Sequence, residues 1–210
     1  MYTIGMTADE LVKEFNADLP QVIRISDIKQ KKVDKRIRQA SVFPVYLYTA
    51  FKSLRGNQWI ILFEAKSRKA VGDNCLMTMV SLVETNEGRY AIMWSSVNEK
   101  PQYLMFTPHF FQRFASRAGI DASGVELVYR YFKFNSSYGF NVVKEIIEDK
   151  QKINVYGSTS EGVALGVKLY SENNIILFKT FITYDMCKGN QIEDFARADS
   201  IRRELHDETY

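Results

Sequence analysis

The stretch Gln102-Tyr-Leu-Met-Phe-Thr-Pro-His-Phe-Phe-Gln-Arg-Phe-Ala-Ser-Arg-Ala-Gly119 predicts a strand that leads directly into a helix of about three turns. Thr107 is a favourable N-cap residue, and Pro108 suits the first helical position, where its missing N–H group has no helical partner to lose. Gly119 stands where a left-handed residue commonly ends a helix. The strand-to-helix junction therefore has well-marked limits.

The two faces of this helix differ in chemistry. At about 100° per residue, His109, Arg113 and Arg117 fall within one narrow sector. The opposite side collects the apolar residues Phe110, Phe111, Phe114 and Ala118. We expect one face in the core and a cationic face outside.

Strand-like segments precede and follow this junction. Residues 59–65, 76–84, 89–94 and 102–106 are short, rich in β-branched or aromatic residues, and separated by the turn-formers at 72–74 and 85–88. They predict an antiparallel meander. A second strand group is expected at 152–156, 162–170 and 174–183, with a hairpin turn at 172–174.

Helical patterns occupy the rest of the chain. A capping box at 7–10 predicts a short helix over 8–17 that Pro20 stops, followed by a brief strand or turn at 23–28 and a polar helix to about residue 39. Apolar residues at three- and four-residue intervals predict an amphipathic helix over 43–54, with Pro44 in its first turn. Further helices are expected at 123–134, 141–149 and 191–205.

The order of elements, helices then strands, helices, strands and a last helix, favours an α+β fold over a parallel doubly wound one. We expect an antiparallel sheet or sheets with packed helices. Residues 1–56 would form an N-terminal helical arm and residues 57–210 an α+β domain, together one continuous globular unit, because no Gly- or Pro-rich linker divides the chain.

Composition excludes several classes of protein. The 210 residues are 46% hydrophobic and 13% aromatic, which is ample for a buried core. The apolar runs are far shorter than the roughly 20 residues that cross a bilayer, and no secretion signal is visible, so we expect a cytoplasmic protein without membrane contact. Cys75 and Cys187 have no Cys or His neighbour at metal-ligand spacing.

Positive charge is concentrated in two segments. The formal net charge is only +3, but Lys and Arg gather at 29–38 and 66–69. Such blocks either lie on a solvated surface without a partner or contact nucleic acid or an acidic protein. The candidate nucleic-acid-binding residues are Lys31, Lys32, Lys35, Arg36, Lys66, Arg68 and Lys69.

The candidate catalytic residues are His109, Arg113, Arg117, Lys179 and Tyr184. Histidine can move a proton to or from a ribose hydroxyl near neutral pH, and arginine can hold a phosphate with two hydrogen bonds. Lys179 and Tyr184 lie on a strand that could complete a phosphate site. The alternative is that His109 covers the first helical turn, that the arginines meet water or acidic side chains, and that the strand is a lysine-protected edge.

The phosphate-loop, dinucleotide, nucleophile-elbow and zinc-protease motifs are all missing from the sequence, which argues against nucleotide-fold enzymes and zinc proteases. We expect no cofactor and no metal site. Aromatic residues near the cationic helix either stack bases of a single strand or belong to the core, and we favour the core. These residues are Tyr103, Phe106, Tyr129 and Tyr131.

The pattern H-x-x-x-R-x-x-x-R-x-G-I runs from His109 to Ile120, and strands that end in Ile182-Thr-Tyr184 follow downstream. Over roughly residues 106–186 the chain resembles small nucleases of the barnase, EndoU, colicin and RelE-like group. The resemblance implies metal-independent RNA cleavage, which is common in toxins and mobile-element proteins.

Three hypotheses for function stay open. The first is a metal-independent ribonuclease-like or RNA-processing protein that uses His109. The second is a non-enzymatic module that binds nucleic acid or an acidic protein through residues 29–38 and 66–69. The third is a structural or assembly protein, for example from a phage or mobile element, whose aromatic surface serves self-association.

Overall fold

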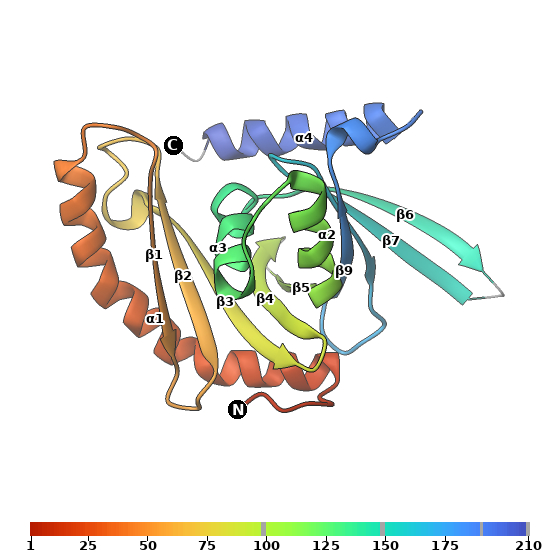
Figure 1. Cartoon of the computed structure of the whole chain (residues 1–210), viewed down its shortest axis with the longest axis horizontal. Coiled ribbons are helices and arrows are strands. Elements are labelled where there is room, and N and C mark those ends of the chain that lie inside the picture. The colour runs from red at the N-terminus through yellow and green to blue at the C-terminus, as the bar shows by residue number, and fades with distance from the viewer. Residues whose placement is uncertain (98–99, 148–149, 190, 209–210) are drawn as a thin grey trace.

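A computed structural model describes residues 1–97, 100–147, 150–189 and 191–208 as a nine-stranded sheet with four α-helices (Figure 1). The strands are β1 (Val45–Lys52), β2 (Gln58–Ala65), β3 (Leu76–Thr85), β4 (Gly88–Val97), β5 (Lys100–Phe106), β6 (Gly139–Ile147), β7 (Lys150–Ser158), β8 (Val163–Lys168) and β9 (Ile175–Ile182). The helices are α1 (Ala8–Gln39), α2 (Pro108–Ala118), α3 (Gly124–Phe134) and α4 (Gln191–Glu208), with short 3-10 helices η1 (Gly72–Asn74) and η2 (Tyr184–Met186). The α+β prediction is confirmed. No helix in the described ranges is long and apolar enough to span a bilayer.

The sheet consists of two antiparallel meanders that meet at a parallel junction. Its strand order is β1-β2-β3-β4-β5-β9-β8-β7-β6, and of the strand pairs within the described residues only β5–β9 is parallel. Strand β1 forms one edge and β6 the other, and the β6–β7 hairpin extends beyond the helices (Figure 1). Both predicted strand groups therefore belong to one sheet.

Helices cover both faces of the first meander. Consecutive residues of β2 point to opposite faces, so Ile60 and Leu62 pack with α2 and α3, whereas Trp59 and Ile61 pack with α1. This double burial explains the uninterrupted apolar run in β2, which an open antiparallel sheet would replace with alternation.

Helix α1 is longer than the sequence predicts. It begins at a capping box between Thr7 and Glu10, as expected, but it continues through Pro20 to Gln39, so the predicted stop and the strand or turn at 23–28 are wrong. Proline removes one helical hydrogen bond and kinks a helix, and α1 changes direction along the molecule (Figure 1). The helix continues past Pro20 because residues beyond it, such as Val22 and Ile37, are buried against the sheet.

The predicted helix over 43–54 is also wrong. Residues 45–52 form strand β1, which pairs with β2 across the domain boundary expected at residue 56. Both faces of β1 contact a helix layer, because Leu47 and Phe51 pack on the α1 side and Tyr46 packs on α3. Because apolar residues lie on both faces of β1, their spacing along the chain resembles the three- and four-residue spacing of a helix.

The predicted helix over 141–149 is a strand as far as the structure describes it. Residues 139–147 form β6, which pairs along its length with β7, and residues 148–149 lie outside the described part. Val142 and Val143 are exposed on this edge strand. Their β-branched side chains favour a strand, and the pairing with β7 outweighs the helical spacing of the apolar residues.

Helix α4 confirms the last predicted helix and packs against β6 and β7. At Gly139 an added Cβ would lie 1.9 Å from the Ala198 carbonyl oxygen, so only glycine allows this approach. The Ser158 hydroxyl donates to the Phe195 carbonyl at 3.3 Å. The second meander is thus held by its own helix.

A buried acidic pair fixes α1 to the β1–β2 turn. The Glu14 carboxylate accepts two hydrogen bonds from Arg55, at 2.8 and 2.6 Å. Asp18, only 1% exposed, accepts from the Asn57 amide at 2.8 Å and from the Trp59 indole at 2.9 Å. The Arg55 guanidinium holds the pKa of Glu14 at about 2, below its ordinary 4.5.

We predict that this contact makes the fold acid-sensitive. Glu14 binds its proton more weakly in the folded chain than in the unfolded one, so its stabilising contribution is present above pH 4.5 and is lost as the pH falls towards 2. Arg55 is half exposed, so solvent screening limits the contribution to about 1–2 kcal/mol.

Urea unfolding of the wild type and of Glu14→Gln at pH 7, 4 and 2.5 measures this contribution. The variant should be less stable at pH 7, and the difference should shrink at pH 2.5. A difference that stays constant with pH would contradict the assignment.

Candidate functional site

Helix α2 has the predicted limits and the predicted faces. The Thr107 hydroxyl accepts from the Phe110 amide at 3.2 Å, and Gly119 ends the helix with a left-handed φ of 64°. Three phenylalanines, Phe110, Phe111 and Phe114, are buried, whereas His109 and Arg113 are exposed. The helix packs on β9, so the structure brings together the two segments that carry the candidate catalytic residues.

The three cationic positions of α2 do not act as one cluster. Arg113 Nε donates to His109 Nε2 at 3.1 Å, and both side chains face solvent. Arg117 is half-buried, donates to the Phe181 carbonyl oxygen, and lies 3.4 Å from the Thr180 hydroxyl. Its guanidinium is therefore engaged in holding α2 on β9.

The other two candidate catalytic residues, Lys179 and Tyr184, differ in their surroundings. Lys179 is exposed on β9. Tyr184 lies in η2, and its hydroxyl donates to the Thr159 carbonyl at 2.5 Å. Burial raises the pKa of Tyr184 to about 12, so the hydroxyl keeps its proton near neutral pH. Among the five candidates, a hydrogen bond joins His109 and Arg113, whereas Arg117 and Tyr184 bond to residues outside the group.

The fold joins the two basic segments. On α1, the side chains of Lys31, Lys32, Lys35 and Arg36 are exposed, as are Arg68 and Lys69 in the loop after β2, while Lys66 is half-buried. Arg68 Nη2 donates to the Ala40 carbonyl at the end of α1, at 2.8 Å. The Gly72 amide donates to Asp34 Oδ1 at 2.9 Å. These two contacts bring the loop alongside the last turns of α1.

Helical spacing shows which α1 cations lie nearest the loop. Lys31, Lys35 and Arg38 follow one another at steps of four and three residues, so they form one stripe. This stripe flanks Gln30 and Asp34, the side of the helix that meets the loop. We call the joined surface of residues 27–40 and 66–69 the basic surface.

The basic surface differs in charge from the rest of the chain. It holds nine Lys and Arg residues against two Asp residues, although the whole chain has a formal charge of only +3. The remainder of the protein is therefore slightly acidic. Such asymmetry directs a polyanion to one end of the molecule.

A further group of residues was not anticipated from sequence. At the β1 edge, the Tyr48 ring stacks on Tyr129 of α3 at 4.0 Å, and Tyr46 packs on Phe134 at 5.6 Å. Lys133 Nζ lies over both Tyr46 and Phe134, at 5.1 and 4.8 Å from the ring centroids. We call these five residues the aromatic platform.

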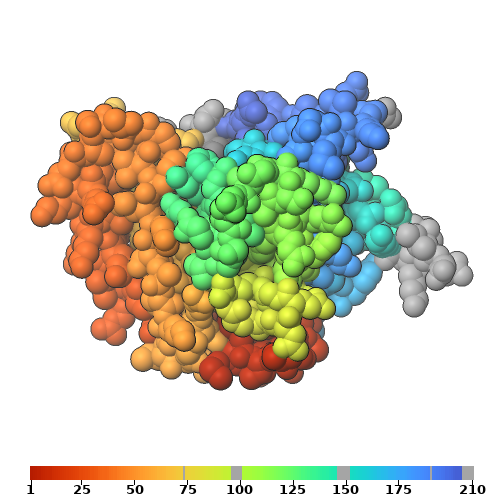
Figure 2. Space-filling view, in the orientation of Figure 1, coloured from red at the N-terminus to blue at the C-terminus, as the bar shows by residue number. Residues whose placement is uncertain are grey.

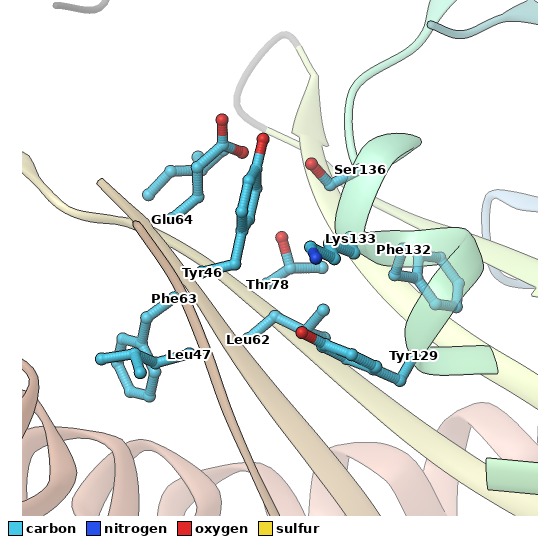
Figure 3. A pocket seen from close by; sticks show the side chains of 11 residues that line it. Tyr46, Leu47, Leu62, Phe63, Glu64, Thr78, Tyr129, Phe132, Lys133 and Ser136 are labelled. Carbon is cyan, nitrogen blue, oxygen red and sulfur yellow. The ribbon is translucent and has the colours of Figure 1, made fainter. Parts of the chain in front are cut away.

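The platform borders a narrow cleft between α3 and strands β1–β3 (Figure 3). Tyr46 stands beside Glu64, and Lys133 extends towards it from α3 (Figure 3). Burial raises the pKa of the Glu64 carboxyl above its usual range. The signal available in the sequence was the i, i+2 spacing of Tyr46 and Tyr48, which places both rings on one face of a strand.

The other aromatic candidates belong to the core, as the sequence analysis favoured. Tyr103 is 5% exposed, and Phe106 and Tyr131 are fully buried. Tyr129 is the exception, because its ring lies at the surface against Tyr48.

Comparison of the chain with protein-family models, with curated proteins and with solved structures found no match.

We predict that Arg117 stabilises the fold whereas Arg113 does not. Arg117→Ala removes the donor for the Phe181 carbonyl and should lower the free energy of unfolding by about 1–2 kcal/mol. Arg113→Ala, a matched control one turn earlier, loses only an exposed contact and should change it by less than about 0.5 kcal/mol. Urea unfolding measures both, and equal losses would show that Arg117 has no special role.

Proposed function

We propose that this protein binds nucleic acid without cleaving it, through the basic surface. The observation that carries the proposal is the hydrogen bond from Arg68 to the Ala40 carbonyl, which joins two cationic segments far apart in sequence into one surface. Neither segment alone would offer as many cations to a single backbone.

Phosphate chemistry fits this surface better than a small-molecule ligand. Exposed lysines on a helix and an adjoining loop can each neutralise a phosphate, releasing counterions and binding without sequence preference. Arg68 and the stripe of Lys31, Lys35 and Arg38 supply such groups on neighbouring elements. Binding of this kind needs no proton acceptor and no pocket.

We predict that reversing charge on the basic surface weakens binding. The variant Lys31→Glu/Lys35→Glu/Lys69→Glu should bind labelled 30-nucleotide strands at least about tenfold more weakly than the wild type. The slope of log affinity against log salt should fall by about two, since each lost phosphate contact contributes about 0.7–0.9. Fluorescence anisotropy at several salt concentrations gives both quantities.

The matched control is Lys13→Glu/Lys168→Glu/Lys188→Glu, which makes the same charge change at exposed lysines elsewhere. This control should keep more of the affinity and of the salt slope. Equal losses in the two variants would overturn the basic surface as the binding site, and retention of no nucleic acid by the wild type would overturn the function.

RNA cleavage at α2 is a second candidate function, favoured by one observation. His109 is exposed and its Nε2 lies 3.1 Å from Arg113 Nε, so an imidazole and a guanidinium are presented together on a surface that a polymer can reach. In this candidate Arg113 turns from His109 to the phosphate, and the freed His109 Nε2 takes the proton of a ribose 2′-hydroxyl. The 2′-oxygen forms its bond to phosphorus as the bond from phosphorus to the 5′-oxygen breaks, and the leaving 5′-oxygen takes a proton from water. Arg117, Lys179 and Tyr184 would act outside the reacting centre.

For this candidate we predict cleavage of RNA but not DNA in EDTA, since the reaction uses the 2′-hydroxyl and no metal. His109→Ala should reduce the rate at least about a hundredfold, and Arg113→Ala should reduce it as well. Lys188→Ala, prepared in parallel, controls for a contaminating nuclease. Unchanged cleavage by His109→Ala would refute the catalytic role.

A further inference from the structure

Tyr48 is the exposed member of the aromatic platform, at the edge of the sheet, and the other four residues are half-buried. Tyr48 is 46% exposed although one side of its ring stacks on Tyr129 at an interplanar angle of 29°. Among the described strands, β1 pairs with β2 alone and lies at the edge of the sheet. The seam between β1–β2 (orange) and α3 (green) reaches the surface in the space-filling view (Figure 2).

Cations are interleaved with the rings of this platform. Lys133 lies over Tyr46 and Phe134, and the Arg130 guanidinium lies 4.3 Å from the Phe134 centroid while it pairs with Glu161 at 2.6 Å. Positive groups beside aromatic faces can attract a phosphate backbone and hold its bases at the same place.

The acidic side chains beside the aromatic platform suit the bases of a nucleic acid and not its phosphates. Glu64 stands beside Tyr46, and Glu126 lies one turn before Arg130 on α3. A carboxylate repels phosphate but accepts hydrogen bonds from the amino groups of nucleobases. Hydroxyls of Tyr46, Thr78 and Ser136 line the same cleft (Figure 3). The polar groups therefore suit base edges, while phosphates stay with the cations.

The platform and the basic surface approach each other at the start of β1, although α1 and α3 lie on opposite faces of the sheet. Tyr46 pairs with Glu64 in the β1–β2 ladder, and Val45 pairs with Ala65, the residue directly before Lys66. The same loop reaches Ala40 through Arg68, and the chain from Ala40 leads into β1. One strand of nucleic acid can thus pass from the basic surface around the β1 edge onto the exposed ring of Tyr48.

We infer that the nucleic acid bound by this protein is single-stranded, with a base stacked on the exposed ring of Tyr48 in the aromatic platform. The inference rests on the proposed function. Duplex bases are already stacked inside the helix and present no free face to an aromatic ring, whereas unpaired bases do. The phosphates of the same strand lie along the basic surface.

The test separates bases from phosphates. We would measure the affinity of the wild type for a labelled 12-nucleotide thymidine strand and for a strand of equal length in which abasic sites replace the bases. The wild type should bind the thymidine strand about tenfold more tightly. Tyr48→Ala should abolish this preference and leave the affinity for the abasic strand unchanged.

The unchanged affinity of Tyr48→Ala for the abasic strand excludes a loss of folding, and two further variants test whether the ring of Tyr48 carries the preference. Tyr48→Phe keeps the ring and should keep the preference, and Tyr170→Ala, at an exposed tyrosine after β8, should not affect it. Equal wild-type affinity for the two strands, or equal weakening of both by Tyr48→Ala, would overturn the inference.

The outcomes distinguish failure of the proposed function from failure of the single-strand inference. If the basic-surface variant weakens both strands but no base preference exists, the proposed function stands and the single-strand inference fails. If the wild type binds neither strand, both fail.

Discussion

The parallel pairing of β5 with β9 is the constraint on which the rest of the structure depends. It joins two antiparallel meanders into one sheet, with Phe106 stacked on Phe178 at 5.1 Å. The Thr107 amide extends the pairing by donating to the Phe178 carbonyl at 3.1 Å, and α2 begins at that point. The helix must then cross β9, which places Arg117 against the Phe181 carbonyl. One residue of the cationic face of α2, Arg117, therefore helps to hold the two meanders together.

Local signals in the sequence predicted the central elements well. The turn-formers and caps placed β2 to β5, α2 and α3 close to their observed limits, because those limits depend on neighbouring residues alone. The errors arose where distant packing outweighs a local rule. Pro20 should end a helix, but burial of the residues beyond it keeps α1 continuous. Strand β1 shows a helical period only because both of its faces contact helices from other parts of the chain.

The candidate sites were predictable only in part for the same reason. The sequence predicted the exposed pair His109 and Arg113, since their position follows from one helix. It offered no means to know that Arg117 would bind a carbonyl 64 residues away. Likewise, nothing in the sequence distinguishes the two basic segments or the tyrosines of β1 from ordinary surface residues. They become neighbours only when the β1–β2 ladder and the Arg68 contact bring them together.

The β5–β9 junction also determines the order in which the chain can complete its fold. The first meander contains only neighbouring strands and can form once residue 106 has emerged from the ribosome. Its last strand then keeps one row of backbone groups unpaired until β9 emerges from the ribosome, about 70 residues later. During that interval the phenylalanines of α2 lack much of the surface that buries them. The nascent chain thus passes through a stage in which an open strand edge and an aromatic helix face are exposed together, a stage at which chaperones commonly protect growing proteins.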